Sequence, residues 1–325
     1  MEISMTDTLA SPFDPEIADF AHRFGTAMNE EGVDVSEWRR RYSSFMAEQG
    51  SPDVAVPTRD ITVPTRHGDM KARLYLPSNV RSALLIYAHG GGFVVGDLDS
   101  LDVPLHALSH GANIAILSLD YALAPENMYP VGLEQCQDAL VWADKHRQEL
   151  GDVRSLGIAG DSAGGNFTAL LTQWAAQTGG PKIAWQALIN PVLDFVAVQE
   201  SSTESHRLYG TSPMLSTEAM QIFLQSYFRD RAAMVEASPL LSSQGYPELP
   251  PTFIAAAECD ALRDDSLAYA RKLTESGVPV ELKVYAGMSH NFMTLTRISR
   301  TAREFLDDFI AAASKWAART EVEGS

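Results

Sequence analysis

Residues 157–167 read GIAGDSAGGNF and place a single serine, Ser162, among four glycines. Glycine inside a strand or helix costs about 0.5 to 1 kcal/mol relative to alanine, so backbone shape matters more in this stretch than local stability. The apolar run SLGIA precedes the serine, and a helical pattern starts near Ala163. A G-x-S-x-G spacing between a strand and a helix predicts a nucleophile elbow, a tight turn that presents the serine hydroxyl. The alternative is a glycine-rich structural turn, and the strand–turn–helix setting favours the elbow.

A serine hydroxyl needs a base to act as a nucleophile, and His290 is the candidate base. It stands in GMSHNF, directly after the strand-like run VELKVYAG, where a loop would open at the catalytic edge of a sheet. Other histidines have less suitable placements: in predicted helices (His22, His146), at a hairpin turn (His67), flanking an early helix (His106, His110) and in an insertion (His206). Each of these is better explained as a surface or core histidine.

Asp260 is the candidate acid that would orient the base, because it ends the strand-like run TFIAAAECD. Glu258 is a rival, since alternate residues of a strand share a face, but Asp260 lies further towards the catalytic loops. Asp264 and Asp265 fall in the first turn of a predicted helix, where acids stabilise the N-terminus. The order Ser, Asp, His is the one expected after a nucleophile elbow.

The segment YAHGGGFVVG, residues 87–96, predicts an oxyanion hole after an early strand. Consecutive glycines allow unhindered N–H groups to converge on one oxygen, and losing one such donor typically costs about 2.7 to 4 kcal/mol of transition-state stabilisation. The predicted donors are the amides of Gly91, Gly92 and Ala163. A flexible turn or a phosphate-binding loop is the alternative. The spacing is not G-x-G-x-x-G and no P-loop Lys-Ser/Thr follows, which argues against a nucleotide site.

Short apolar runs alternate with helical patterns along most of the chain. The predicted strands are ALLIYAHG, IAILSLDY, SLGIAGDS, WQALINP, TFIAAAECD and VELKVYAG, and DITVPTRHGDMKARLYLP predicts a hairpin around a His-Gly-Asp turn. Predicted helices lie within 13–49 and over 131–150, 163–178, 264–277 and about 300–319. This alternation predicts an α/β fold with a mostly parallel sheet and helices on both faces.

Residues 194–235 break this rhythm with a polar loop and an aromatic-rich amphipathic stretch. An insertion at the carboxyl end of a strand lies where α/β sheets bind ligands, so it could roof a pocket together with the N-terminal helices. The alternative is a surface excursion without function. The expected organisation is a helical cap segment at 1–55, the catalytic core at 56–193, the cap insertion at 194–235 and the rest of the core at 236–325.

Composition narrows the function classes. The formal net charge of −17 and a sequence pI near 4.8 argue against binding to nucleic acid or to anionic membranes, which need clustered cations. Two cysteines, Cys136 and Cys259, exclude a disulfide framework, and two buried free thiols are favoured over a single bridge. An acidic N-terminus without an apolar stretch, and no apolar run of about 18 residues, predict an unexported cytoplasmic protein without a stable membrane anchor.

Taken together and in order, HGGGF, DYALAPE, GDSAGGN, DALRD and GMSHNF resemble the hormone-sensitive-lipase-like (family IV) esterases of the α/β-hydrolase fold, in the branch with GDSAG at the nucleophile. The resemblance covers about residues 60–310. It implies Ser162, Asp260 and His290 as the catalytic triad and the amides of Gly91, Gly92 and Ala163 as oxyanion donors. It also implies that the N-terminal helices and the insertion form a cap over the acyl pocket, and it leaves a homodimer open.

The expected function is a serine carboxylesterase that cleaves short- to medium-chain acyl esters, as the resemblance implies, with no metal or organic cofactor. Two alternatives stay open: an amide or carbamate hydrolase with the same machinery, and a non-catalytic ligand receptor on the same fold. The candidate pocket residues are Phe93, Phe195, Tyr209, Met214, Phe223 and Tyr227. An amphipathic cap helix would bury such residues against the sheet in any case, so their role in the pocket is an expectation only.

Overall fold

The computed structural model describes residues 13–323, apart from 29, 31, 79–80, 243–245 and 247–248. Residues 1–12 lie outside the described residues. They include the acidic N-terminus on which the prediction about export rests and the first part of the predicted cap segment 1–55. Within the described chain, eight strands form one sheet in the order β1-β2-β4-β3-β5-β6-β7-β8. Their bounds are β1 Thr58–Thr65, β2 Gly68–Tyr75, β3 Arg81–Ala88, β4 Ile114–Asp120, β5 Ser155–Asp161, β6 Ile183–Ile189, β7 Thr252–Ala257 and β8 Val280–Tyr285.

The sheet is mostly parallel, as predicted. Strands β3 to β8 run in one direction, and the β1–β2 hairpin joins antiparallel to β4 at one edge. The central strand β5 is buried along its whole length, which fits a sequence, SLGIAGD, whose five middle residues are all apolar or glycine. Because the carboxyl ends of parallel strands meet at one edge of the sheet, the residues that follow β3, β5, β7 and β8 come together there.

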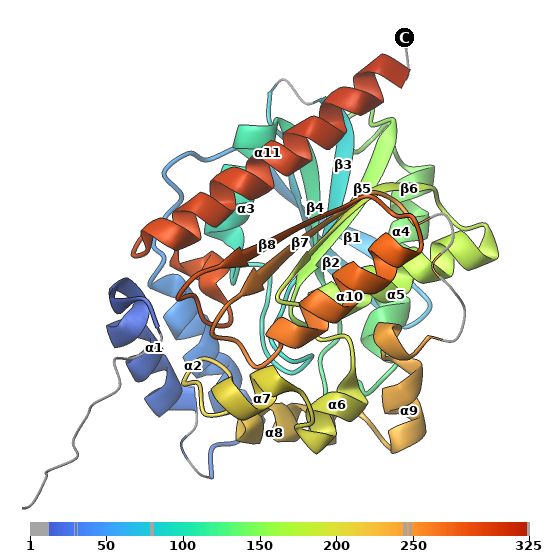
Figure 1. Ribbon diagram of the computed structural model, residues 1–325. Coiled ribbons are helices and arrows are strands. Elements are labelled where there is room, and N and C mark those ends of the chain that lie inside the picture. Colours follow the sequence, from blue (N-terminus) through green and yellow to red (C-terminus); the bar gives the residue numbers. More distant parts are fainter. Residues whose placement is uncertain are drawn as a thin grey trace, which may run out of the picture.

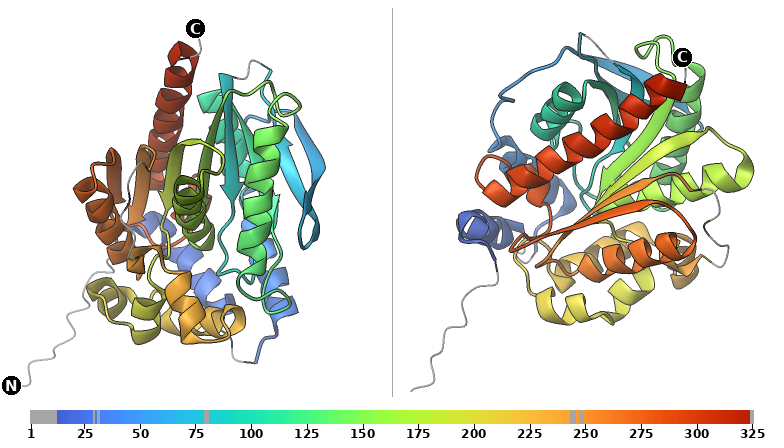
Figure 2. Two further views of the ribbon diagram at one scale, coloured as in Figure 1. Left: turned by 90° about the vertical axis from the view of Figure 1, so that its right-hand side faces the viewer. Right: turned by 45° about the horizontal axis from the view of Figure 1, so that its top comes forward.

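Helices cover both faces of the sheet (Figure 1, Figure 2). α3 and α11 pack on one face, and α4, α5 and α10 pack on the other. Their bounds are α3 Asp102–Ala112, α4 Val131–Lys145, α5 Ala163–Thr178, α10 Arg263–Glu275 and α11 Arg300–Glu323. The three-layer arrangement confirms the α/β-hydrolase fold expected from the sequence.

A further set of helices lies together at the carboxyl end of the strands (Figure 1). These are α1 Pro15–Met28, α2 Val35–Ala47, α6 Phe195–Glu200, α7 Glu204–Tyr209, α8 Thr217–Tyr227 and α9 Arg231–Glu236. Polar side chains start five of them by accepting hydrogen bonds from first-turn amides: Asp34, Asp194, Thr203, Ser216 and Asp230. The helices of this layer come from two segments, 15–47 and 195–236, which are far apart in the sequence and close in space.

Some details of the predicted helices were wrong. His106 and His110 lie inside α3 instead of flanking it, because the helix continues to Ala112 and ends where Asn113 adopts a left-handed conformation with φ of 56°. α4 ends at Lys145 instead of residue 150, since His146 leaves the helical conformation with φ of −110° and ψ of 25°.

The two cysteines, Cys136 and Cys259, are buried and form no disulfide, as the sequence analysis favoured. Among the described residues, no helix combines the length and the apolar character needed to cross a membrane.

Candidate active site

Ser162 lies in a sharp turn between β5 and α5, with φ of 52° and ψ of −114°. Its amide donates to the carbonyl of Ile189 on β6 (2.8 Å), which holds the turn against the neighbouring strand. A Cβ atom on Gly160 would lie 2.4 Å from the backbone of Gly164, and one on Gly164 would lie 1.9 Å from the carbonyl oxygen of Ala88. The glycines around Ser162 are therefore required because three backbone segments approach each other too closely for any side chain.

The structure brings Ser162, His290 and Asp260 into one chain of hydrogen bonds. His290 Nε2 lies 2.9 Å from Ser162 Oγ, and His290 Nδ1 lies 2.8 Å from Asp260 Oδ2. The other oxygen of Asp260, Oδ1, accepts the amide of Leu262 (3.0 Å), which fixes the carboxylate. All three side chains are at least 90 % buried, so the network is shielded from bulk water. This geometry allows a proton to pass from the serine hydroxyl to the imidazole while the carboxylate holds the ring in place.

The other acids near Asp260 are used elsewhere. Glu258, the rival considered above, accepts the amide of Gly287 (2.8 Å) and braces the turn after β8. Asp265 is buried and its Oδ2 accepts the amides of Leu193 (2.7 Å) and Asp194 (3.1 Å) at the start of the 194–235 insertion. Burial raises the pKa of Asp265 to about 7. Glu258 and Asp265 thus each accept backbone amides that stabilise a turn or a loop, and neither belongs to the Ser–His–Asp network.

The loop after β3 lies beside Ser162 with its glycines in conformations that other residues rarely adopt. Gly91 has φ of 114° and Gly92 has φ of 59°. Among the described residues, the amides of Gly91, Gly92 and Ala163 have no acceptor within the protein. Three free N–H groups beside the serine hydroxyl form an arrangement that can accept an oxyanion.

Asp161 connects this loop to the nucleophile turn, and sequence reasoning did not assign it a role. Its Oδ1 accepts hydrogen bonds from the Gly90 amide (3.0 Å) and from the Tyr87 hydroxyl (2.9 Å). Burial raises the pKa of this carboxyl group. The signal available in the sequence was an acid at the end of an otherwise apolar strand, which must find partners when buried.

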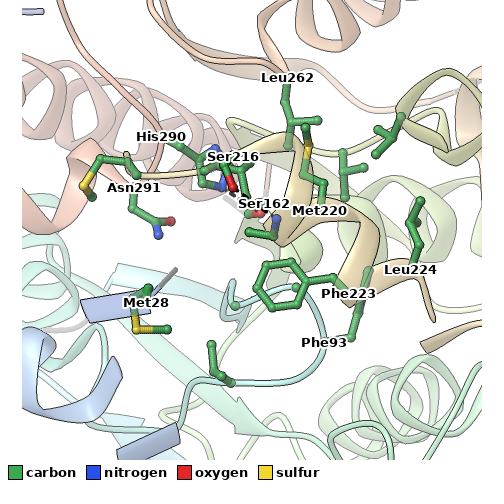
Figure 3. A pocket seen from close by; sticks show the side chains of 18 of the residues that line it. Met28, Phe93, Ser162, Ser216, Met220, Phe223, Leu224, Leu262, His290 and Asn291 are labelled. Atoms are coloured by element: carbon green, nitrogen blue, oxygen red, sulfur yellow. Dashed lines mark hydrogen bonds between the residues drawn. The ribbon is translucent and has the colours of Figure 1, made fainter. Parts of the chain in front are cut away.

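A cavity opens above Ser162, and counted with its open mouth it has a volume of about 820 Å³. Four of the predicted pocket residues line it: Phe93, Phe195, Met214 and Phe223. Figure 3 shows Phe223 and Phe93 on the side of the cavity formed by α8 and the glycine loop. The prediction for Tyr209 was wrong, because its ring lies under the Arg263 guanidinium (5.4 Å) and does not line the cavity.

Tyr227, the remaining predicted aromatic, stacks on Phe93 with ring centroids 3.9 Å apart and is buried behind the cavity wall. It supports the wall without lining it.

Several lining residues were not predicted from the sequence. Phe24 and Met28 reach the cavity from α1, Trp38 and Tyr42 from α2, and Asn291 from the turn after β8. Trp38 and Tyr42 are four residues apart on the buried face of α2, a spacing that marks a buried helix face but does not say what it is buried against. Only the fold shows that this face covers Ser162.

Comparison with known proteins agrees with this geometry. The sequence model of a family described as the alpha/beta hydrolase fold matches residues 85–294. The chain belongs to this α/β-hydrolase family. Two relatives of this α/β-hydrolase are the carboxylic ester hydrolase LipN of Mycobacterium tuberculosis (33% identity, 86% of this chain, 76% of the relative) and an ethyl acetate hydrolase of Pseudomonas putida (33%, 87% and 90%).

Among solved structures, a hyperthermophilic esterase from the archaeon Pyrobaculum calidifontis superposes with a TM-score of 0.87 at 29% identity. That alignment covers 94% of this chain and 99% of the other. Similarity to esterases over nearly the whole length, in sequence and in structure, makes this α/β-hydrolase a carboxylic ester hydrolase.

Proposed function

We propose that this α/β-hydrolase is a serine carboxylesterase of the hormone-sensitive-lipase-like type, in the GDSAG branch, with Ser162 as nucleophile. The observation that carries the proposal is the position of His290, which bridges Ser162 Oγ and Asp260 Oδ2 at 2.9 and 2.8 Å beneath the cavity. A serine hydroxyl in contact with an oriented imidazole is activated for attack on a carbonyl carbon.

The proposed reaction has two steps. His290 Nε2 takes the Ser162 proton as Oγ attacks the ester carbonyl, and the tetrahedral intermediate expels the alcohol, to which His290 returns the proton. Water then attacks the acyl-enzyme, again losing a proton to His290, and the acid is released as Ser162 Oγ recovers its proton. Asp260 holds the ring so that Nε2 faces Ser162 and stabilises the imidazolium formed in each step.

The amides of Gly91, Gly92 and Ala163 would hold the negative oxygen of both intermediates. Backbone donors fixed by the loop and by the first turn of α5 need little reorganisation as charge develops, which makes them effective in the transition state. The Asp161 carboxylate keeps the loop close to the elbow through the Gly90 amide. Asp161 is thus a positioning residue and does not contact the substrate.

Short- to medium-chain acyl esters are the proposed substrates. The cavity wall is mainly apolar, with Phe93, Phe195, Met214 and Phe223 among the lining residues, and so suits an alkyl chain. The Pseudomonas putida relative is an ethyl acetate hydrolase, which supports a small acyl group. Residues 1–55 and 194–235 are proposed as the cap, because α1, α2 and α8 supply much of the wall opposite the sheet. The homodimer stays a prediction.

Hydrolysis of p-nitrophenyl esters from acetyl to palmitoyl, measured on the wild type and on Ser162→Ala, tests this proposal. We expect the highest kcat/KM at short acyl chains and a loss of at least about 10³-fold in the variant. Ser276→Ala is the matched control, because Ser276 is an exposed serine at the far end of α10. A Ser162→Ala variant that retained wild-type turnover would overturn the assignment.

Two further measurements separate the alternatives. A fluorophosphonate probe should label the wild type and Ser276→Ala but not Ser162→Ala, whereas a non-catalytic receptor would not be labelled. Matched ester and anilide substrates with the same acyl group distinguish an esterase from an amide hydrolase. We expect hydrolysis of the ester to exceed that of the anilide, and the reverse order would favour the amide hydrolase.

A further inference from the structure

The cavity above Ser162 has polar groups that neither the proposed reaction nor the fold employs. Its lining is mostly apolar, and its few polar side chains are Trp38, Tyr42, Ser162, Ser216, His290 and Asn291. The Trp38 indole donates to the Met28 carbonyl (2.9 Å), and the Ser216 hydroxyl accepts the Ala219 amide (3.1 Å) to start α8. Ser162 and His290 are assigned to catalysis. Tyr42 and Asn291 are left over.

Asn291 directs a free amide group into the cavity. Its backbone has φ of 61° and ψ of 16°, and its backbone carbonyl accepts the Thr294 amide (3.0 Å) and hydroxyl (2.8 Å), which holds the backbone of this turn in place. Figure 3 shows this side chain pointing into the cavity next to His290 and facing the side where Met28 lies. Within the described part of the chain, the Asn291 side-chain amide makes no hydrogen bond to protein.

Tyr42 on α2 also lines this cavity. Its ring is held by an edge contact with Phe24 (centroids 6.3 Å apart), and only 4 % of the residue is exposed. Across the described residues, its hydroxyl makes no hydrogen bond to protein, although the Asp161 and Asp97 carboxylates lie close enough to affect it electrostatically. The turn at Asn291 and the ring of Tyr42 are thus held by the structure, while the side-chain amide and the hydroxyl make no hydrogen bond to the described protein residues.

Filling such a cavity with a purely alkyl substrate would separate the hydroxyl and the amide from water without replacing their hydrogen bonds, which is unfavourable for each group. An ester that carries a further oxygen atom can replace them. A site with fixed hydrogen-bonding groups discriminates against substrates that lack the matching atom much more strongly than an apolar site discriminates between chain lengths.

We infer that Tyr42 and Asn291 form a hydrogen-bonding subsite and that the preferred substrates are esters with an additional ether, keto or hydroxyl oxygen in the acyl or alcohol part. This inference rests on the proposed esterase function and refines its substrate class. It goes beyond a preference for acyl-chain length, because two esters of equal length should be hydrolysed at different rates if only one of them carries the additional oxygen.

Pairs of isosteric substrates test the inference. The acyl pair is p-nitrophenyl methoxyacetate and p-nitrophenyl butyrate, and the alcohol pair is 2-methoxyethyl acetate and butyl acetate. In each pair an oxygen replaces one methylene. The ratio of kcat/KM within a pair is compared between the wild type and each variant, so that the different intrinsic reactivities of the two esters cancel.

Tyr42→Phe removes only the hydroxyl, and Asn291→Gly removes the amide while tolerating the positive φ. We expect at least one of the two pair ratios to fall by about three- to tenfold in each variant, mainly through the oxygenated ester. Met220→Leu is the control, because Met220 lines the same cavity without a hydrogen-bonding group and should leave both ratios unchanged.

The outcomes separate the inference from the function on which it rests. Ratios that agree within twofold between the wild type and both variants, for both pairs, overturn the subsite while leaving the esterase in place. If the wild type hydrolyses none of the four esters, the proposed function fails, and the inference fails with it. Because Tyr42→Phe removes a single hydroxyl group and keeps the ring, this variant tests the subsite even if Asn291→Gly does not fold.

Discussion

The carboxylate of Asp161 accepts a hydrogen bond of 3.0 Å from the backbone amide of Gly90. This contact joins the residue before Ser162, the proposed nucleophile, to the residue before Gly91 and Gly92, whose amides are the proposed oxyanion donors. Both partners are buried, and burial raises the pKa of Asp161, so the interaction lies in an environment where hydrogen bonds are strong and their loss is costly. The Asp161 side chain therefore links the turn that holds the proposed nucleophile to the loop that holds the proposed oxyanion donors.

Asp161→Ala should lower kcat by about 10- to 100-fold with little change in KM. The loop would lose its tie to the elbow, and donors that act mainly on the transition state would be displaced. Asp161→Asn retains an acceptor oxygen and should restore most of kcat. Steady-state kinetics on p-nitrophenyl butyrate and thermal unfolding of both variants provide the measurement. A folded Asp161→Ala with wild-type kcat would show that the loop holds its position without this contact.

Gly92→Ala should reduce kcat/KM by about tenfold or more, because a Cβ at this position would lie 2.4 Å from Cγ of Phe223 on α8. The loop and the ring cannot both keep their positions. In a Phe223→Ala background the contact with the ring is removed and only the strain of the positive φ of Gly92 remains, so the same substitution should cost less than it does in the wild type. A double-mutant cycle with four proteins measures this coupling. Additive effects would mean that the backbone conformation of Gly92, and not its proximity to Phe223, excludes a side chain.

The parts of this molecule that sequence predicts are those set by short-range rules. Ser162, Asp260 and His290 each follow an apolar strand, and residues after parallel strands meet at one edge, so their proximity follows once the strands are recognised. α5 covers 163–178 in both prediction and structure. In these segments the local sequence pattern favours the same secondary structure as the packing in the folded protein.

The remaining features depend on contacts between segments distant in sequence. Tyr209 is an aromatic residue of the kind that often lines a pocket. Its ring instead packs against the guanidinium of Arg263 on α10. Tyr42 reads as an ordinary buried helix position, and only the packing of α2 over Ser162 places it in the cavity. Periodicity identifies a buried face, but it contains no information about what that face is packed against.

Gly164→Ala should destabilise the protein severely, although alanine is the better helix former by about 1 kcal/mol. The added Cβ would lie 1.9 Å from the Ala88 carbonyl oxygen, and β3 cannot move away without breaking its pairing with β4 and β5. Gly165→Ala is the matched substitution in the same turn, and its Cβ would meet the side chain of Pro191 at 2.8 Å. Denaturant unfolding should show a loss of more than about 3 kcal/mol for Gly164→Ala and a smaller loss for Gly165→Ala. Equal losses would contradict the role given to Ala88.

Asp265→Asn should change how stability depends on pH. Burial raises the pKa of Asp265 to about 7 in the folded protein, against an ordinary value of about 3.9 in an unfolded chain. Between these values the folded state binds a proton that the unfolded state does not, so this contribution to stability is complete below about pH 4 and is lost as pH rises through 7. Asparagine does not titrate, and its side-chain oxygen can still accept the amides of Leu193 and Asp194.

Thermal unfolding from pH 5.5 to 8.5 measures this difference. The melting temperature of the wild type should fall relative to that of Asp265→Asn as pH rises, by roughly 2 °C or more. Asp264→Asn is the control. Burial acts to raise the pKa of Asp264, but hydrogen bonds from Ser205 and Arg263 outweigh it and lower this pKa, so the group stays ionised throughout the range. The wild-type curve should therefore run parallel to that of Asp264→Asn. Parallel curves for all three proteins would mean that Asp265 is already ionised in the fold and that the Leu193 and Asp194 amides, by donating to its carboxylate, outweigh its burial.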